Sequence, residues 1–209
     1  MERHVLHFSF AAALLAACTS APVGEHQMAS ESDLNEVHTV LKRDFHAHGI
    51  ATMARLEPDP VQRTCNLHAD NPPGELAKSL EDEQLKTIKF PAGGMMGDWK
   101  RGQKIAESGV GMQWTDKTGN PAGGSCYNCH QLSPQQESFG TLGPSLRGFG
   151  KGRGNDVELQ RYVYGKIYNA KAYNLCSQMP RLGHSGTLTE QQIKDLVAYL
   201  LDAASPVNQ

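Results

Sequence analysis

The pentapeptide Cys126-Tyr127-Asn128-Cys129-His130 constrains this chain more strongly than any other part of its sequence. Residues at positions i, i+3 and i+4 of a helical turn share one face, so the two cysteines and the histidine point in the same direction. Two thiols in this arrangement can form thioethers with the vinyl groups of a haem while the imidazole reaches the iron, and Cys-x-x-Cys-His is the sequence signature of c-type haem attachment. The motif therefore predicts one covalently bound haem held by Cys126, Cys129 and His130.

Two other kinds of site use closely spaced cysteines. A structural zinc site needs four protein ligands, whereas the remaining cysteines are scattered singly at Cys18, Cys65 and Cys176. A thioredoxin-like dithiol is expected within a βαβ unit, and no β-rich pattern precedes the motif. The sequence therefore favours haem attachment over both alternatives.

The haem iron needs an axial ligand on each side, and Met/His ligation is the arrangement found in cytochromes c. Met179 is the only methionine after the motif and lies in a loop between predicted helices, so we expect its thioether to bind the iron, with His184 as the rival ligand. A ligating histidine normally donates its other ring N–H to a carbonyl or carboxylate. The Pro144 carbonyl, held in a stiff turn, is the partner we expect for His130, although Gly143-Pro144 is also compatible with an ordinary turn.

The N-terminal residues have the pattern of an export signal. An apolar run from Phe8 to Ala17 is too short for a membrane span and has the length of a signal-peptide core. Leu15-Ala16-Ala17-Cys18 resembles a bacterial lipobox, after which Cys18 would become the lipidated N-terminus, and cleavage after Ala21 is the alternative. We therefore expect a lipoprotein-type signal peptide at 1–17, a flexible tether at 18–32 and a periplasmic protein with a lipid anchor at Cys18.

The rest of the chain has room for one modest domain with an appendage, since it has 209 residues and 39% hydrophobic content. Its net charge of −2 argues against general nucleic-acid binding. Apolar spacing predicts a helical N-terminal extension at 33–90, with an amphipathic helix over 33–56 and a short charged helix over 75–85. The core domain is expected at 91–203, with a tail at 204–209.

Three helices are predicted in the core domain, and poor strand patterns make the expected fold class mostly α. Asp98 should cap the first helix, the second spans 156–168, and a capping box of Thr189 and Gln192 should begin the third. Gly102 lies inside the first helix, where glycine costs about 1 kcal/mol relative to alanine. Its presence suggests that the C-terminal helix crosses closely at this point. The glycine-rich segment 140–154 is predicted to be a loop.

Cys65 and Cys176 are the two cysteines left once the haem motif and Cys18 are set aside. Unpaired thiols are unusual in exported proteins, so we expect a disulfide that ties the extension to the Met179 loop. Two free buried thiols are the alternative.

These features together resemble a known family. Residues 91–203 look like a class I cytochrome c around one covalent haem, and more narrowly like the SoxX family, a likeness that also includes Cys65 and the Pro72-Pro73 break. The lipobox is where the chain departs from a simple soluble subunit. The segments that carry the resemblance are Met96-Gly97-Asp98-Trp99, Gly140-Thr141-Leu142-Gly143-Pro144-Ser145-Leu146, Gly165-Lys166-Ile167-Tyr168-Asn169-Ala170, Cys176-Ser177-Gln178-Met179-Pro180-Arg181 and Thr189-Glu190-Gln191-Gln192-Ile193-Lys194-Asp195.

The resemblance implies a monohaem subunit of the SoxAX complex, which oxidatively couples thiosulfate to a cysteine of the SoxYZ carrier in an L-cysteine S-thiosulfotransferase reaction. In that family the sulfur chemistry belongs to the SoxA subunit. This chain would then form a heterodimer with a SoxA-type cytochrome, supply no catalytic residue and relay electrons to a small cytochrome c. The residues agree with a relay, because Met179 would close the haem iron and no paired acid and base stands out.

Two other functions stay open. A free-standing periplasmic electron carrier would not be isolated as a stable heterodimer. A haem-based sensor would need a labile or absent sixth ligand, and its reduced spectrum would change with carbon monoxide.

Overall fold

A computed structural model of the chain describes residues 28–119 and 121–209. The predicted signal peptide and Cys18 lie outside the described residues. Within these two ranges the regular elements are helices, accompanied by one isolated β-bridge between His48 and Ala51. This composition agrees with the mostly α class expected from the sequence. No helix in the described ranges is long and apolar enough to cross a membrane.

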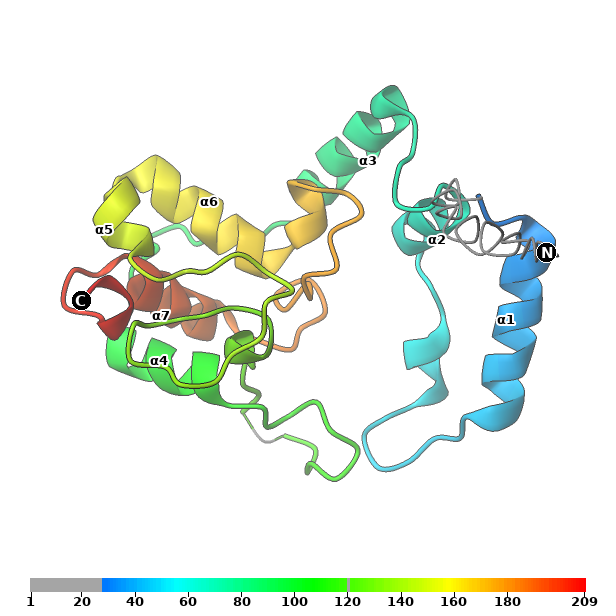
Figure 1. Ribbon diagram of the computed structural model, residues 1–209, viewed down its shortest axis with the longest axis horizontal. Helices are drawn as coiled ribbons and strands as arrows, with labels where there is room; N and C mark the ends of the chain where they lie inside the picture. Colours follow the sequence, from blue (N-terminus) through cyan, green and yellow to red (C-terminus); the bar gives the residue numbers. More distant parts are fainter. Residues whose placement is uncertain (1–27, 120) are drawn as a thin grey trace, which may run out of the picture.

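The core domain is built on the crossing of α4 (Trp99–Glu107) and α7 (Glu190–Leu201), with α6 (Val157–Tyr168) packed against α7 (Figure 1). The close crossing expected at Gly102 is present, because a Cβ atom there would lie 2.1 Å from the backbone oxygen of Asp195. The apolar face of α7 is fully withdrawn from solvent, and each large apolar side chain buried in this way contributes about 1.5–3 kcal/mol. Its most deeply buried members are Ile193, Leu196, Val197 and Tyr199.

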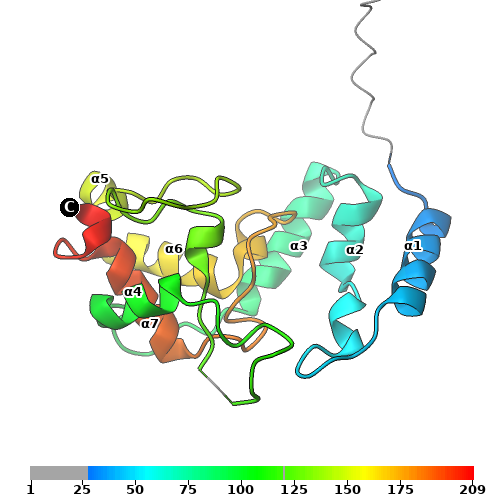
Figure 2. The same cartoon turned by 60° about the horizontal axis from the view of Figure 1, so that its bottom comes forward.

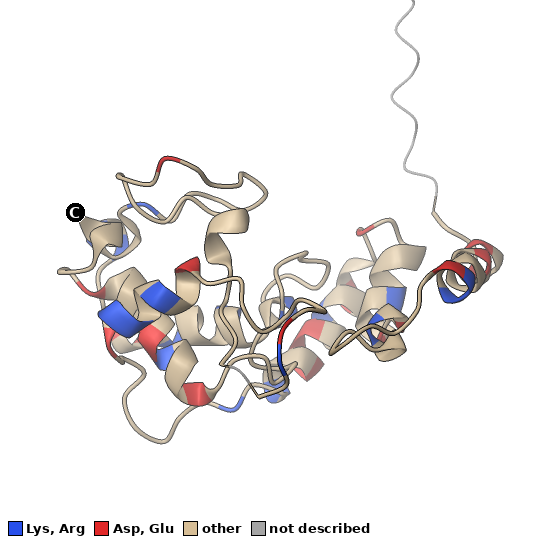
Figure 3. Ribbon diagram, turned by 90° about the horizontal axis from the view of Figure 1, so that it is seen from below, with Lys and Arg blue, Asp and Glu red and all other residues tan. Residues whose placement is uncertain are grey.

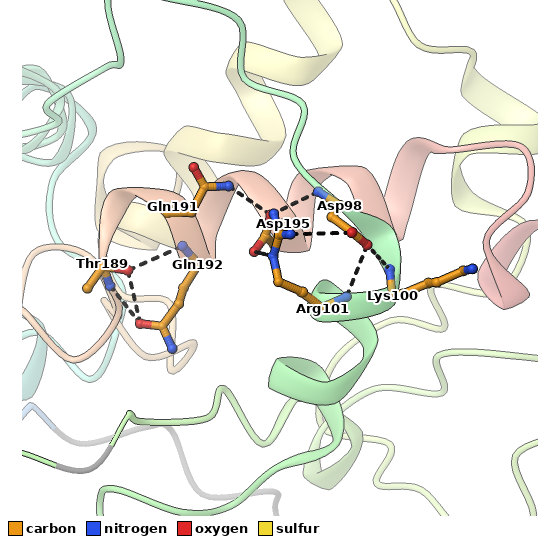
Figure 4. A network of polar contacts seen from close by, with 7 residues as sticks. All are labelled: Asp98, Lys100, Arg101, Thr189, Gln191, Gln192 and Asp195. Carbon is orange, nitrogen blue, oxygen red and sulfur yellow. Dashed lines mark hydrogen bonds and ion pairs between the residues drawn. The ribbon is translucent and has the colours of Figure 1, made fainter.

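A buried carboxylate joins α4 to α7 (Figure 4). Asp195 accepts hydrogen bonds from the backbone N–H of Asp98 at 2.8 Å, from the Arg101 guanidinium at 2.8 and 2.9 Å, and from the Gln191 amide at 2.9 Å. Burial of Asp195 disfavours its charged form, but Arg101 and the other donors outweigh this effect and lower the pKa of the carboxyl. The expected cap of α4 is also formed, since Asp98 accepts from Lys100 and Arg101 N–H groups.

The N-terminal extension differs from the sequence prediction in its first helix. The helix predicted over 33–56 is wrong beyond Asp44: α1 spans Glu31–Asp44, with Ser30 as its N-cap, and a separate 3-10 turn η1 spans Met53–Leu56. Between these two elements the chain turns at Gly49, which adopts a positive φ of 53°. Gly49 lies so close to the exposed residue Trp114 that a Cβ atom would be 1.9 Å from the Trp114 oxygen.

Three shorter elements were also not anticipated. Helix α2 (Pro60–Leu67) begins at a capping box formed by Asp59 and Gln62. Helix α5 (Phe149–Arg153) lies inside the segment predicted as a loop and follows Gly148, whose φ is 69°. The C-terminal residues fold back on the core as a 3-10 turn, η4 (Pro206–Asn208), with Val207 fully buried.

The extension and the core lie side by side (Figures 1 and 2). Helix α3 (Gly74–Lys86), close to the predicted charged helix, packs on a 3-10 turn η3 (Ala170–Ala172) that follows α6. The orange segment after η3 reaches from the core toward α2 and α3 in both views. Acidic and basic residues are mixed over both parts of the protein (Figure 3). The extension is attached to the core through α3 and η3, through the segment that carries Met179 and through the contact of Gly49 with Trp114.

Candidate haem site

The haem motif forms a tight turn. Cys126–Asn128 make a 3-10 turn, η2, in which the N–H of Cys129 and the N–H of His130 both bond to the Cys126 oxygen, at 3.1 and 2.9 Å. Ser125 enters the turn with a φ of 47°, a conformation that few non-glycine residues adopt. The helical turn expected from the spacing is present, and it places both thiols and the imidazole on one short piece of backbone.

Pro144 and Gly143 fix the His130 ring. The Nδ1 atom of His130 lies 2.7 Å from the Pro144 oxygen, and donation of its proton to this carbonyl leaves Nε2 free to bind a metal. A Cβ atom on Gly143 would be 2.2 Å from Cε1 of the ring, so only glycine allows the backbone to approach the imidazole this closely. The Gly143 N–H also bonds to the Cys129 oxygen at 2.8 Å, which links the turn to the proline loop.

The two motif cysteines are the free cysteines among the residues that the structure describes. Desolvation raises the pKa of the Cys126 thiol to about 12, so this thiol is neutral and behaves as an apolar group at physiological pH. Cys126 and Tyr127 are partly buried and pack against the main hydrophobic core.

The two candidates for the sixth ligand have different surroundings. Met179 is half-buried and packs against the same core as Cys126 and Tyr127. His184 is exposed and faces the extension, with its Nδ1 atom 3.3 Å from the Thr87 hydroxyl. Desolvation, then the Arg181 charge, lowers the pKa of His184.

Tyr199 on α7 is not among the site residues expected from the sequence. The side chain is 1% exposed, and its hydroxyl has no hydrogen-bond partner among residues 28–119 and 121–209. Burial, then the charges of Glu107 and Cys126, raises the pKa of Tyr199, so the hydroxyl is neutral and lies in the neighbourhood of the Cys126 thiol. A large amphipathic residue on the buried side of a C-terminal helix is the only sequence signal for this position.

The second cysteine pair forms the disulfide that the sequence predicted. Cys65 on α2 is bonded to Cys176 across a sequence separation of 111 residues. Around the bridge is a small apolar cluster separate from the main core, formed by Val61, Cys65 and Leu175 with Ala77, Leu80 and Cys176. The extension is thus covalently joined to the loop that carries Met179.

The residues of this site fit a c-type haem. Two free thiols with the required spacing, an imidazole whose Nδ1 is occupied by a carbonyl, and a half-buried thioether of the same core are the donor set that such a group needs. Gly143 leaves the imidazole room to lie flat against the loop. Cys126, Cys129, His130 and Met179 are therefore the residues that would hold the haem.

The chain is similar to a known family and to two known proteins. The Cytochrome c family matches residues 99–204. A protein of Aquifex aeolicus (strain VF5) described as an uncharacterized lipoprotein is 32% identical over 212 residues, which cover 100% of each chain. The crystal structure of SoxXA from P. pantotrophus contains a chain that is 27% identical, with a TM-score of 0.39, over 55% of this protein and 88% of that chain.

Proposed function

Because the chain belongs to the cytochrome c family, we propose that it is the electron-accepting monohaem subunit of a SoxAX-type complex. In this proposal a SoxA-type cytochrome couples thiosulfate to a cysteine of a SoxYZ-type carrier, and the present chain takes up the electrons and passes them to a small cytochrome c. The proposal is supported by the sequence segments that resemble SoxX. They run from the residues around Trp99 to the capping box at Thr189 and include the stretch Cys176–Arg181.

The family carries covalently bound haem c, which supplies a centre that gains and loses one electron at a time. In our proposal Cys126 and Cys129 form the thioethers and His130 provides the proximal imidazole. The Pro144 carbonyl keeps the proton on Nδ1 and fixes the orientation of the ring. Met179 would be the second protein ligand of the iron, and ligation by a thioether would raise the reduction potential, as an electron acceptor requires.

The observation that carries the relay function is the pairing of the cysteines. Joining thiosulfate to a carrier thiol forms one S–S bond and releases two electrons and one proton, and a catalytic subunit would need an accessible sulfur nucleophile. Within the described part of this chain, Cys65 and Cys176 are bridged and the other two cysteines belong to the haem motif. The chain therefore has no spare thiol there for sulfur transfer, and we assign the reaction to its partner.

We also propose that the protein is exported and anchored by a lipid at Cys18. The lipobox supports this assignment, and the full-length Aquifex relative is described as a lipoprotein. A lipid at this position would tether the cytochrome to the membrane surface while leaving the haem domain in the aqueous compartment.

The test is reconstitution from purified components. The holoprotein mixed with thiosulfate and a SoxYZ-type carrier should give no adduct by mass spectrometry and no haem reduction. Addition of a SoxA-type cytochrome should produce the adduct together with the absorption spectrum of the reduced haem. Efficient conjugation by this chain alone would contradict the relay and make it the catalytic subunit.

The same sample separates the two alternatives. Failure to co-purify with any second cytochrome, combined with normal haem reduction by small donors, would favour a free-standing electron carrier. A reduced spectrum that changes with carbon monoxide would favour a haem-based sensor, because Met179 would then not hold the sixth position.

A further inference from the structure

Met179 lies in a segment with little regular structure of its own. Between η3 and Arg181 the backbone makes few hydrogen bonds within the segment. The Ser177 N–H bonds to the Asn174 oxygen at 3.1 Å, and the Met179 N–H bonds to the Ser177 hydroxyl at 3.2 Å. Fixing a free backbone residue in one conformation costs about 1–2 kcal/mol. A thioether carried on such a segment therefore needs support from elsewhere in the protein.

The support comes from the N-terminal extension, and helix α2 contacts the segment on both sides of Met179. On one side, Cys65 near the end of α2 is disulfide-bonded to Cys176. On the other side, Asp59, the N-cap of α2, forms an ion pair with Arg181. One eight-residue helix thus holds the residues that flank Met179 in the sequence.

The ion pair is shielded from solvent. The side chain of Arg181 is 15% exposed and that of Asp59 is 32% exposed. Burial disfavours the charged form of Asp59, but the Gln62 N–H and Arg181 outweigh it and lower the pKa of the carboxyl. The two Asp59 oxygens have separate partners, because Oδ1 accepts from the Gln62 N–H at 2.8 Å while Oδ2 faces Arg181. The cap of α2 and the anchor of the Met179 segment are therefore the same carboxylate.

Helix α3 and the core hold the segment at Leu175. The Leu175 N–H donates to the Glu81 carboxylate of α3 at 2.9 Å, and the Leu175 oxygen accepts from the Lys171 ammonium at 3.0 Å. Leu175 and Lys171 are buried, with 3% and 7% exposure. Both backbone polar groups of Leu175 are thus satisfied by side chains, and the segment is held at this residue as well.

We propose that α2 is a positioning element for the sixth haem ligand: the Cys65–Cys176 bridge and the Asp59–Arg181 ion pair together hold Met179 in place for the iron. The inference rests on the proposed ligation by Met179 and adds a role for the extension. A preorganised segment keeps the thioether close to the iron, so that ligand dissociation requires the whole segment to move. When the bridge is cleaved, Met179 dissociates more often and an external ligand competes more easily for the iron.

The experiment measures carbon monoxide binding to the ferrous holoprotein together with the near-infrared sulfur-to-iron band of the ferric form. The variants are the double substitution Cys65→Ser/Cys176→Ser and the single substitution Asp59→Asn. We expect the double variant to bind carbon monoxide at least about ten-fold faster than the wild type. A ten-fold change corresponds to about 1.4 kcal/mol less free energy for holding Met179 on the iron. Asp59→Asn should shift the rate in the same direction by a smaller factor.

One control variant and one alternative way of cleaving the bridge complete the experiment. Lys78→Ala removes an exposed ion pair with Asp82 on α3 and leaves both the bridge and the Asp59–Arg181 pair intact, so it should leave the rate unchanged. If the double variant fails to fold, the bridge can be cleaved in the folded holoprotein by a phosphine, which takes up one oxygen from water as the disulfide becomes two thiols. This treatment should accelerate carbon monoxide binding in the wild type.

The outcomes separate this inference from the ligand assignment. If Met179→Leu retains the sulfur-to-iron band, the assignment of Met179 is wrong and the proposed role of α2 fails with it. If Met179→Leu abolishes the band while the bridge and ion-pair variants bind carbon monoxide no faster than the wild type, the ligand assignment holds and the positioning role is refuted.

Discussion

The contact between α4 and α7 leads to a quantitative prediction for Gly102→Ala. A Cβ atom at this position would lie 2.1 Å from the Asp195 oxygen, 2.6 Å from the Asp195 carbonyl carbon and 2.8 Å from the Tyr199 Cβ atom. Ordinary contacts of a Cβ atom begin at 3.4 Å. The two helices would therefore have to separate by more than one ångström, because the nearest atoms belong to backbone and no side-chain rotation relieves the overlap.

The expected change in the free energy of unfolding is the difference between two opposing effects. Overpacking a well-packed interior costs about 1–3 kcal/mol, and we take the upper end because the crossing joins two backbones. Replacing a helical glycine with alanine stabilises the helix by about 1 kcal/mol, because alanine has the higher helix propensity. We therefore expect Gly102→Ala to lower the free energy of unfolding by about 2 kcal/mol.

Gly152 provides a matched control, because it lies in α5 and a Cβ atom there would meet nothing within 4 Å. Gly152→Ala should be neutral or stabilising by up to about 1 kcal/mol. The two holoprotein variants should be compared by urea denaturation followed by far-ultraviolet circular dichroism, with equal m-values as the condition for the comparison. Equal stability of Gly102→Ala and Gly152→Ala would refute the argument that the glycine is required by the helix crossing.

Three further predictions concern the site, the buried carboxylates and the N-terminus. Gly143→Ala should displace the His130 ring from the Pro144 carbonyl and alter the visible spectrum of the ferrous protein, whereas Gly94→Ala, where a Cβ atom meets nothing within 4 Å, should leave the spectrum unchanged. The folded-state pKa values of Asp59 and Asp195 are lowered from 3.8, so their contribution to stability is fully present above that value and is lost as the pH falls through the lowered pKa values. Thermal denaturation should therefore give a midpoint that falls slightly below about pH 6.5, where the lowered pKa of His184 acts, and falls further below about pH 4, and a constant midpoint below about pH 4 would contradict the assignment. Mass spectrometry of the mature protein from native membranes should find an acylated Cys18 as the first residue, and a chain beginning after Ala21 would show ordinary signal cleavage instead.

Most of the donor set for the haem was predictable from sequence because it depends on local spacing. Cys126, Cys129 and His130 belong to one turn, and the geometry of a turn is a property of neighbouring residues. The helix starts at Asp98 and Thr189 were predicted for the same reason, since a cap joins a side chain to backbone groups three residues away. Gly102 also indicated a close helix crossing, because a glycine within a helix is unfavourable unless another element requires it.

The tertiary structure decided the features that depend on contacts between distant residues. The first helix ends at Asp44, although its apolar spacing continues, and the chain beyond it makes a contact between Gly49 and the distant Trp114 backbone. The Tyr199 hydroxyl is buried, and Tyr199 lies at the point where α7 crosses Gly102 of α4. The anchoring of the Met179 segment by Asp59 joins residues 122 positions apart, and no local pattern specifies such a pair. Local spacing thus indicates the residues of the haem motif, while the packing of the extension on the core brings Cys65 and Asp59 to the segment that carries Met179.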